Sequence, residues 1–545
     1  MPSWLTDAVF YEIYPQTFYD SNGDGIGDIQ GIIEKLDYVK ELGCNALWIN
    51  PCFDSPFKDA GYDVRAYKKV APRYGTNEDL VRLFETAHTK GIRVLLDLVP
   101  GHTSEEHKWF LASGKAHKNE YSGRYIWTDS WFKGIGGHPY IGGEAERDGT
   151  YMLNFFKCQP ALNYGFKEKR ESWQTGMHEP DALATRHALK DIMRFWLDKG
   201  CDGFRVDMAD SLVKDDDENK TGTCEVWREI RDMLDADYPE AALVSEWSNP
   251  YQAINGAGFH MDFYLDHWHN GYNTLLRDYE SNEVDNSYFK SDAYGDINRF
   301  LDDYLPKYNA TKDNGYISFM TCNHDTPRLR YTLSEEELKI AYAFLFTLPG
   351  VPFLYYGDEI GLNYIPDLPS KEGGYTRTGS RTPMQWTDGV NAGFSAAASD
   401  KLYLPVQKED VTETKVLLNC SDSEKAARGC STIKICVENS QKDKNSLYNT
   451  VKDILALRHR EKDLMADAAF NVISHAKDAA FVYQRGDLIM IVNPKNKPAV
   501  LEKKALDAIK NMKVIHTVGN GDGYRAGDDR VPQQTFMMLK NGAIQ

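Results

Sequence analysis

The sequence lacks an excess of basic residues, a long apolar run and a regular pattern of cysteines. Its 545 residues carry a formal net charge of −18, which argues against nucleic acid, an anionic membrane or a phosphorylated substrate as the main partner, because each of these binds a basic surface. No stretch reaches the roughly 18 apolar residues that cross a bilayer, and the first residues show no basic segment followed by an apolar run. We therefore expect a cytoplasmic protein with a neutral partner.

The cysteines argue against a disulfide scaffold as the main source of stability. There are nine of them, an odd number, and their spacing is not that of metal ligands. Reduced and mostly buried thiols are the expectation. Aromatic residues make up 12% of the chain; sugar stacking would use some of them, but large packed cores account for most.

Eight short apolar runs alternate with amphipathic segments over some 360 residues, and the segments at 31–42, 76–89 and 182–198 have helical periodicity. This repetition favours an α/β fold, a (β/α)8 TIM barrel, over a doubly wound sheet, which seldom needs so many repeats. The predicted strands are Val9 to Tyr14, Ala46 to Ile49, Val94 to Val99, Phe204 to Val206, Ala242 to Ser245, Met261 to Leu265, Ile317 to Thr321 and Phe353 to Tyr356.

Two segments interrupt this rhythm and divide the chain. The barrel is expected to occupy 1–102 and 180–466, with an inserted domain at 103–179, after the third strand, that forms one wall of the cleft. Within the second part, 408–445 is a polar insertion, interpreted as a surface loop or, alternatively, as a partner site. Residues 467–545 contain short runs separated by turns and predict a C-terminal antiparallel β domain, a β-sandwich.

Three acidic residues follow strand-like runs. Asp207 ends the run that starts at Gly203, Glu246 follows Ser245, and Asp325 lies in Asn323-His324-Asp325. The C-terminal ends of barrel strands meet at one face, so these carboxylates should converge there. Cleavage through an oxocarbenium-like transition state requires a nucleophile, a proton donor and a further negative charge. The trio therefore predicts a glycosidase.

Asp207 is the predicted nucleophile and Glu246 the predicted acid. Arg205 lies two residues before Asp207, so on a strand both side chains face the same way and the guanidinium would keep the carboxylate ionised. Trp247 could exclude water from Glu246 and raise its pKa, as a proton donor requires.

Two histidines accompany the acids. His102 follows the third strand candidate and His324 precedes Asp325. Taken singly, such a histidine is more often structural. Next to three converging acids, each imidazole becomes a candidate for binding the hydroxyls of the reacting sugar.

Four motifs occur in order along the chain: Asp97 to His102, Gly203 to Asp207, Val244 to Trp247 and Asn323 to Asp325. On these motifs the chain resembles the α-amylase superfamily, glycoside hydrolase family 13, over nearly its whole length. The resemblance implies that Asp207 forms a covalent glycosyl-enzyme, that Glu246 acts as acid and then as base, and that Asp325 binds the distorted sugar, with retention of configuration.

Within the superfamily the chain resembles the branch of oligo-1,6-glucosidases and α-glucosidases. The motifs that carry this resemblance are Gln159 to Asn163, Ala60 to Val64, Asn323 to Arg328 and Ser380 to Trp386. The resemblance implies that Tyr62 stacks under the reacting glucose, while Asp63 and Arg377 grip its far hydroxyl and block the cleft beyond. Arg381 is the competing choice for the arginine. Such a closed pocket implies attack from the non-reducing end.

An acidic loop near the N-terminus is a candidate metal site. It offers oxygen donors at alternate positions, as in the first half of a calcium loop, but lacks the closing glutamate of an EF-hand. The resemblance implies a structural Ca²⁺ or Mg²⁺ without a catalytic role, and a plain Asp/Gly turn is the alternative. The candidate ligands are Asp20, Asn22, Asp24, Ile26 and Asp28.

The chain also departs from the pattern it resembles. Gly101 stands where the superfamily usually has Asn, and Ala161 where the branch usually has Asp; both positions touch the predicted pocket wall. Met208, after the nucleophile, is neither the Val typical of α-1,6-specific members nor the small residue common in α-1,4-specific ones. The linkage preference therefore stays open.

The prediction is a retaining, exo-acting α-glucosidase that hydrolyses short neutral α-glucosides of the isomaltose, maltose or sucrose type. The alternative is a transglycosylase or isomerase of the same family, such as a trehalose synthase or sucrose isomerase. A non-catalytic relative, such as a transporter heavy chain, would have lost the carboxylates and gained a membrane helix. We expect a small neutral oligosaccharide as substrate, no organic cofactor, no nucleic acid or membrane partner, and a monomer or homodimer.

Overall fold

Eight parallel strands form a barrel at the centre of the protein. The computed structural model describes residues 1–267, 270–278, 285–407 and 434–541. The strand order is β11-β10-β9-β8-β5-β2-β1-β12, and a bridge between Met320 and Phe353 brings the two edges together. All eight predicted strands, and with them the TIM barrel, are confirmed. They are β1 (Phe10–Ile13), β2 (Ala46–Ile49), β5 (Arg93–Leu98), β8 (Gly203–Val206), β9 (Ala242–Ser245), β10 (Met261–Phe263), β11 (Tyr316–Ser318) and β12 (Phe353–Tyr355).

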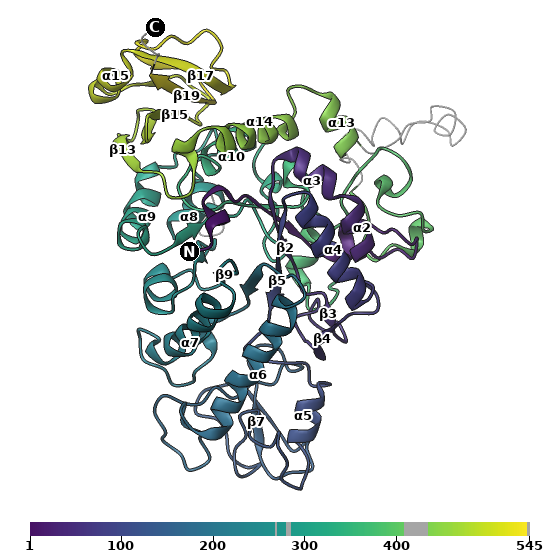
Figure 1. Ribbon diagram of the computed structural model, residues 1–545. Coiled ribbons are helices and arrows are strands. Elements are labelled where there is room, and N and C mark those ends of the chain that lie inside the picture. Colours follow the sequence, from purple (N-terminus) through teal and green to yellow (C-terminus); the bar gives the residue numbers. More distant parts are fainter. Residues whose placement is uncertain (268–269, 279–284, 408–433, 542–545) are drawn as a thin grey trace.

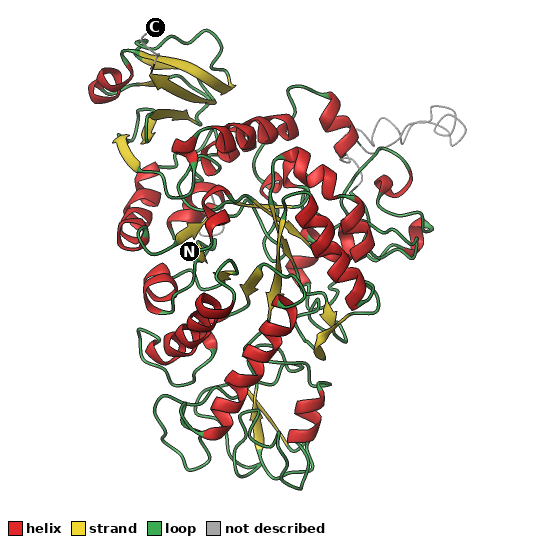
Figure 2. Ribbon diagram, viewed as in Figure 1, coloured by secondary structure: helices red, strands yellow, loops and turns green. Residues whose placement is uncertain are grey.

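Helices surround the barrel (Figure 2). Two of them begin with a capping box, in which Thr76 and Asp79 cap α4 and Ser334 and Glu337 cap α10, so orphan backbone donors are satisfied at both helix starts. The helix predicted at 31–42 is instead two helices, because the chain turns at Lys35, whose ammonium lies over the ring of Tyr19. The principal helices are α2 (Ile29–Glu34), α3 (Leu36–Leu42), α4 (Asn77–Thr89), α6 (Pro180–Leu197), α7 (Thr221–Asp237), α8 (Gly271–Leu276), α9 (Ile297–Thr311), α10 (Glu335–Leu345) and α14 (Leu447–Arg460).

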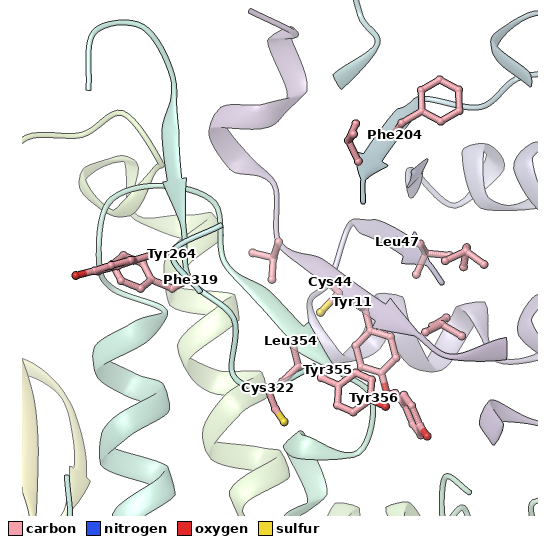
Figure 3. Packing of buried hydrophobic residues seen from close by; sticks show 14 of the residues in the cluster. Tyr11, Cys44, Leu47, Phe204, Tyr264, Phe319, Cys322, Leu354, Tyr355 and Tyr356 are labelled. Atoms are coloured by element: carbon pink, nitrogen blue, oxygen red, sulfur yellow. The ribbon is translucent and has the colours of Figure 1, made fainter. Parts of the chain in front are cut away.

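The strands alternate between two cores. Phe10 and Phe353 point into the barrel and stack with ring centroids 4.3 Å apart. Their neighbours Tyr11 and Leu354 point outward into the layer beneath the helices (Figure 3). This alternation follows from the two-residue period of a strand. Because both faces are covered, the strands read as near-continuous apolar runs, which is why the sequence located them well.

The segment between β5 and α6 leaves the barrel, as predicted for 103–179. It contains α5 (Lys108–Ser113) and an antiparallel pair, β6 (Tyr140–Gly142) with β7 (Thr150–Met152). A further pair, β3 (Phe53–Asp54) with β4 (Ala66–Val70), follows β2. The segment around α5 and β7 lies at the end of the molecule opposite the C-terminal sheet (Figure 1). The exact domain boundaries remain predictions.

The C-terminal part is an antiparallel sheet of five strands in the order β13-β14-β15-β19-β17. One face packs on the barrel's α10 side through residues such as Tyr483 and Phe536, and the other is covered by α15 (Lys503–Ile509) through Ala505 and Ile509. The second layer is thus mainly this helix and the short pair β16 (Ala499–Val500) with β18 (Arg530–Val531). The five strands are β13 (Phe470–Ser474), β14 (Phe481–Arg485), β15 (Leu488–Asn493), β17 (Met512–Gly519) and β19 (Thr535–Asn541).

Most of the predicted 408–445 insertion, residues 408–433, lies outside the described residues. Its end forms α13 (Val437–Lys442). The seven cysteines in the described residues are free and buried. Within the described ranges, none of the helices has the length and apolar character needed to cross a membrane.

Candidate active site

Arg205 gathers three carboxyl groups at the C-terminal ends of β5, β8 and β9. Its Nη1 lies 3.0 Å from an oxygen of Asp97 and 3.0 Å from Oδ1 of Asp207, and its Nη2 lies 2.9 Å from Oε2 of Glu246. Strand register places Asp97 directly beside Arg205. The predicted nucleophile and the predicted acid are therefore held by a single buried guanidinium.

Because three carboxyl groups share the Arg205 guanidinium, each receives only part of its stabilisation. Burial and the neighbouring Glu246 raise the pKa of Asp207, and Arg205 opposes them. The expectation that Arg205 keeps Asp207 ionised is thus incomplete, because the same cation also serves Asp97 and Glu246. Covalent attack requires an ionised nucleophile, and Arg205 is the cation that favours the charged form of Asp207.

Asp325 lies in a cationic clamp. Its Oδ1 accepts hydrogen bonds from Arg377 at 3.1 Å and from Arg381 at 2.7 Å, and His324 Nε2 lies 3.4 Å from its Oδ2. Burial favours the neutral acid, but His324 and the two arginines outweigh it and hold the pKa of Asp325 well below its usual range. Both arginines that the sequence left as alternatives therefore contact this acid, which stays ionised.

The side chains of His324 and Tyr62 stack and hydrogen-bond to each other next to Asp97 and Asp325. Their rings are 5.5 Å apart and 15° from parallel, and the Tyr62 hydroxyl lies 2.8 Å from His324 Nε2 and 3.1 Å from Asp97. On its other side His324 meets Glu12 at 2.9 Å. Glu12 was missed from the sequence, although a charged residue inside the apolar first strand is a signal of a buried partner.

His102 is fully buried at the end of β5. Its Nδ1 lies 3.1 Å from the amide nitrogen of Asn154, which belongs to the inserted segment. Burial lowers the pKa of His102 to about 3, so the ring is neutral. The structure therefore brings His102 to the same strand end as Asp97, with one nitrogen already used by Asn154.

Asp63 does not pair with Arg377, so that part of the prediction was wrong. The carboxylate of Asp63 accepts hydrogen bonds from Ser55 Oγ and from the backbone N–H groups of Lys58 and Asp59, and so stabilises the turn between residues 55 and 63. The partner of Arg377 is Asp59, 3.3 Å away.

Gln159 donates to the second oxygen of Asp59 at 2.7 Å. Sequence reasoning missed Asp59 because two acids flank Ala60, Gly61 and Tyr62, and only the turn of the loop decides which acid faces the site. The ion pair between Asp59 and Arg377 stands between the loops that follow β2 and β12.

Comparison with known proteins agrees with this geometry. The model of the α-amylase catalytic domain matches residues 12–467. The chain belongs to the α-amylase family. The trehalose synthase/amylase TreS of Mycolicibacterium smegmatis is 32% identical to this chain, and the match covers 89% of this chain and 80% of TreS. The oligo-1,6-glucosidase of Heyndrickxia coagulans is 30% identical, and the match covers 89% of this chain and 90% of that enzyme. The crystal structure of the α-glucosyl transfer enzyme XgtA matches with a TM-score of 0.77 at 26% identity, and the match covers 99% of this chain and 100% of XgtA.

The acidic loop of this α-amylase family enzyme is closed by its own hydrogen bonds. Asp20 accepts from the backbone of Gly23 and Gly25, and Asp28 accepts from Ser21 and Gly31 and caps α2. Oxygen donors of this kind suit Ca²⁺ or Mg²⁺, but no three acidic, imidazole or thiol groups in the described residues gather as a metal site. The structural metal stays a prediction, and no catalytic step depends on it.

Proposed function

We propose that the protein is a retaining, exo-acting α-glucosidase that hydrolyses short neutral α-glucosides. The observation that carries this proposal is the sharing of Arg205 by Asp207 and Glu246. A common guanidinium holds the two carboxyl groups at close quarters, which favours the short spacing of retaining enzymes over the wider spacing that admits a water between the acids.

In this proposal Asp207 attacks the anomeric carbon while Glu246 gives its proton to the leaving oxygen. The glycosyl group then rests on Asp207, and Glu246 removes a proton from the incoming water. Asp325, kept ionised by Arg377 and Arg381, stabilises the positive charge that develops on the ring and binds its hydroxyls.

Exo-action is supported by the pair of Asp59 and Arg377. The two side chains come from loops after different strands and meet next to Asp325. A sugar bound at Asp325 would have this ion pair as its neighbour, so the pair would contact the terminal sugar and limit extension beyond it. The net charge of −18 also fits a neutral substrate.

The test is product analysis after incubation with maltose, isomaltose, sucrose, trehalose and longer malto-oligosaccharides. Release of glucose from the short sugars, with the α-anomer formed first as followed by proton NMR, is the expected result. Initial release of the β-anomer would refute retention, and faster cleavage of long chains than of disaccharides would refute exo-action.

Similarity to a trehalose synthase/amylase over 89% of the chain favours a second candidate, an isomerase of the trehalose synthase type. Such an enzyme would return the leaving glucose to the glycosyl-enzyme in place of water. The same chromatography separates the two reactions, because trehalose formed from maltose would identify the isomerase.

A further inference from the structure

His102 has one ring nitrogen fixed by the protein and one left over. Asn154 lies 3.1 Å from Nδ1, and Nε2 is buried without a hydrogen-bond partner among the described residues. The backbone of Tyr62 lies close enough to hydrogen-bond weakly to the ring and to oppose the lowering of its pKa, but its geometry does not satisfy Nε2. A neutral imidazole has one donor and one acceptor nitrogen. The group that faces Nδ1 therefore decides what Nε2 can offer.

Lys214 settles the orientation of the Asn154 amide. Its Nζ lies 3.1 Å from Oδ1 of Asn154 and also donates to the carbonyl of Ser211. An ammonium only donates, so the Asn154 oxygen must face Lys214 and its NH₂ group must face His102. Met208 Sδ, 3.8 Å from the same nitrogen, is the second acceptor for that NH₂ group. The donors and the acceptor of the amide are thus all in use.

The burial of the Lys214 ammonium costs free energy, and its contact with the Asn154 oxygen offers a reason for this cost. Lys214 is 8% exposed and has no ion pair within 4 Å in the described part of the chain, although the charge of Asp210 acts on it from farther away. Burial lowers its pKa to about 8. Lysine is almost never buried without a partner, and here the polar contacts it makes are with Asn154 and the Ser211 carbonyl.

Gly101 makes room for this arrangement. A Cβ atom at this position would lie 2.8 Å from the amide nitrogen of Asn154, a distance that would force the side chain away. The residue before His102 therefore has to lack a Cβ atom for Asn154 to reach Nδ1 in this position. This accounts physically for one of the three departures found in the sequence, Gly101 in place of Asn.

We propose that Lys214 and Asn154 are positioning residues that fix His102 as the tautomer with its proton on Nε2, ready to donate to a hydroxyl of the bound sugar. The chain of donors runs from Lys214 to the Asn154 oxygen, and from the Asn154 nitrogen to His102. Asn154 lies in the inserted segment and Lys214 lies after β8, so the device also couples that segment to the barrel. The role in sugar binding rests on the proposed α-glucosidase function.

The decisive variant is Asn154→Asp. It keeps the shape and gives Lys214 a salt bridge, but it presents an acceptor to Nδ1 and so moves the proton away from Nε2. We expect kcat/KM for an aryl α-glucoside to fall roughly tenfold, as for one lost hydrogen bond, at an unchanged melting temperature. Asn119→Asp, an exposed position in the same inserted segment whose amide contacts only backbone groups, is the matched control and should leave kcat/KM unchanged.

Two further readouts separate positioning from a structural role. Against a series of monodeoxy aryl glucosides, wild-type enzyme should lose most activity when one particular hydroxyl is missing, and Asn154→Asp should reduce that difference. Lys214→Met should lower kcat/KM by a few fold, and Lys214→Arg, which keeps the donor, should restore it. Gly101→Ala and Asn154→Ala act on the same contact, so their effects should not add.

Nitrogen-15 NMR of histidine-labelled protein reads the tautomer of His102 without substrate. A protonated Nε2 in wild type and an altered tautomer in Asn154→Asp would support the proposal. The same tautomer in both proteins, or an unchanged kcat/KM and hydroxyl preference in Asn154→Asp, would overturn it. If no α-glucoside is cleaved by wild-type enzyme, the proposed function fails, while the NMR result still decides the tautomer.

Discussion

Substitution of Asp59 and of Asp63 by asparagine should have opposite consequences. Asp59 contacts Arg377 at 3.3 Å and Gln159 at 2.7 Å, next to Asp325. If the pair binds the terminal sugar, Asp59→Asn removes a charge-assisted contact worth about 1.5–3 kcal/mol, which corresponds to a loss of about 10- to 150-fold in kcat/KM. The fold should be kept, because the amide can still occupy the same space.

Asp63→Asn should act on stability instead. Both carboxylate oxygens of Asp63 accept backbone N–H groups, at 3.0 Å from Lys58 and 3.0 Å from Asp59, and one also accepts from Ser55. An NH₂ group in place of either oxygen would face a backbone donor and leave it unsatisfied. The cost of such a buried unsatisfied group is about 1–3 kcal/mol.

The assay is kcat/KM on an aryl α-glucoside together with the free energy of unfolding of each variant. Asp59→Asn should lose activity at wild-type stability, and Asp63→Asn should lose stability with a smaller change in activity of the folded enzyme. A larger loss of kcat/KM in Asp63→Asn at wild-type stability would refute the assignment and return the sugar-binding role to Asp63.

The other predictions concern the acids and the acidic loop. Asp207→Asn should lower kcat by several orders of magnitude at an unchanged melting temperature, since covalent catalysis is lost but packing is not; Glu246→Gln should impair substrates with poor leaving groups far more than activated aryl glucosides, as comparison of the two substrates will show. Chelation should lower the melting temperature if the loop from Asp20 to Asp28 binds a metal in the folded state only; no shift would favour a plain turn. Burial raises the pKa of Asp59 to about 6, so kcat/KM should fall below about pH 6, with a shallower acid limb in Asp59→Asn. Because this folded-state pKa lies above the unfolded value of about 3.9, the contribution of Asp59 to stability should decrease as the pH rises from about 4 to 6.

The barrel could be predicted because its strands are short apolar runs buried on both faces, and the acids at their ends could be predicted because strand ends converge. The loop residues could not be placed in this way. Asp59 and Asp63 are four residues apart, and which of them faces Arg377 depends on the turn that Ser55 and the backbone of Lys58 form around Asp63. Asn154 was missed for a related reason, since the sequence predicts that the inserted segment forms one wall of the cleft but not which of its residues reaches His102.

What separates hydrolysis from transfer lies outside the acid cluster. In both reactions Asp207 would carry the glycosyl group and Glu246 would deprotonate the acceptor, so the arrangement around the acids is compatible with either. The outcome depends on whether the leaving sugar stays long enough to compete with water. Phe155, 52% exposed, stands beside Phe156, whose ring lies near Arg377. An exposed aromatic surface at this edge can hold a sugar by stacking, so we expect substitutions of Phe155 to change the balance between the two reactions more than the rate of glycosyl transfer to Asp207.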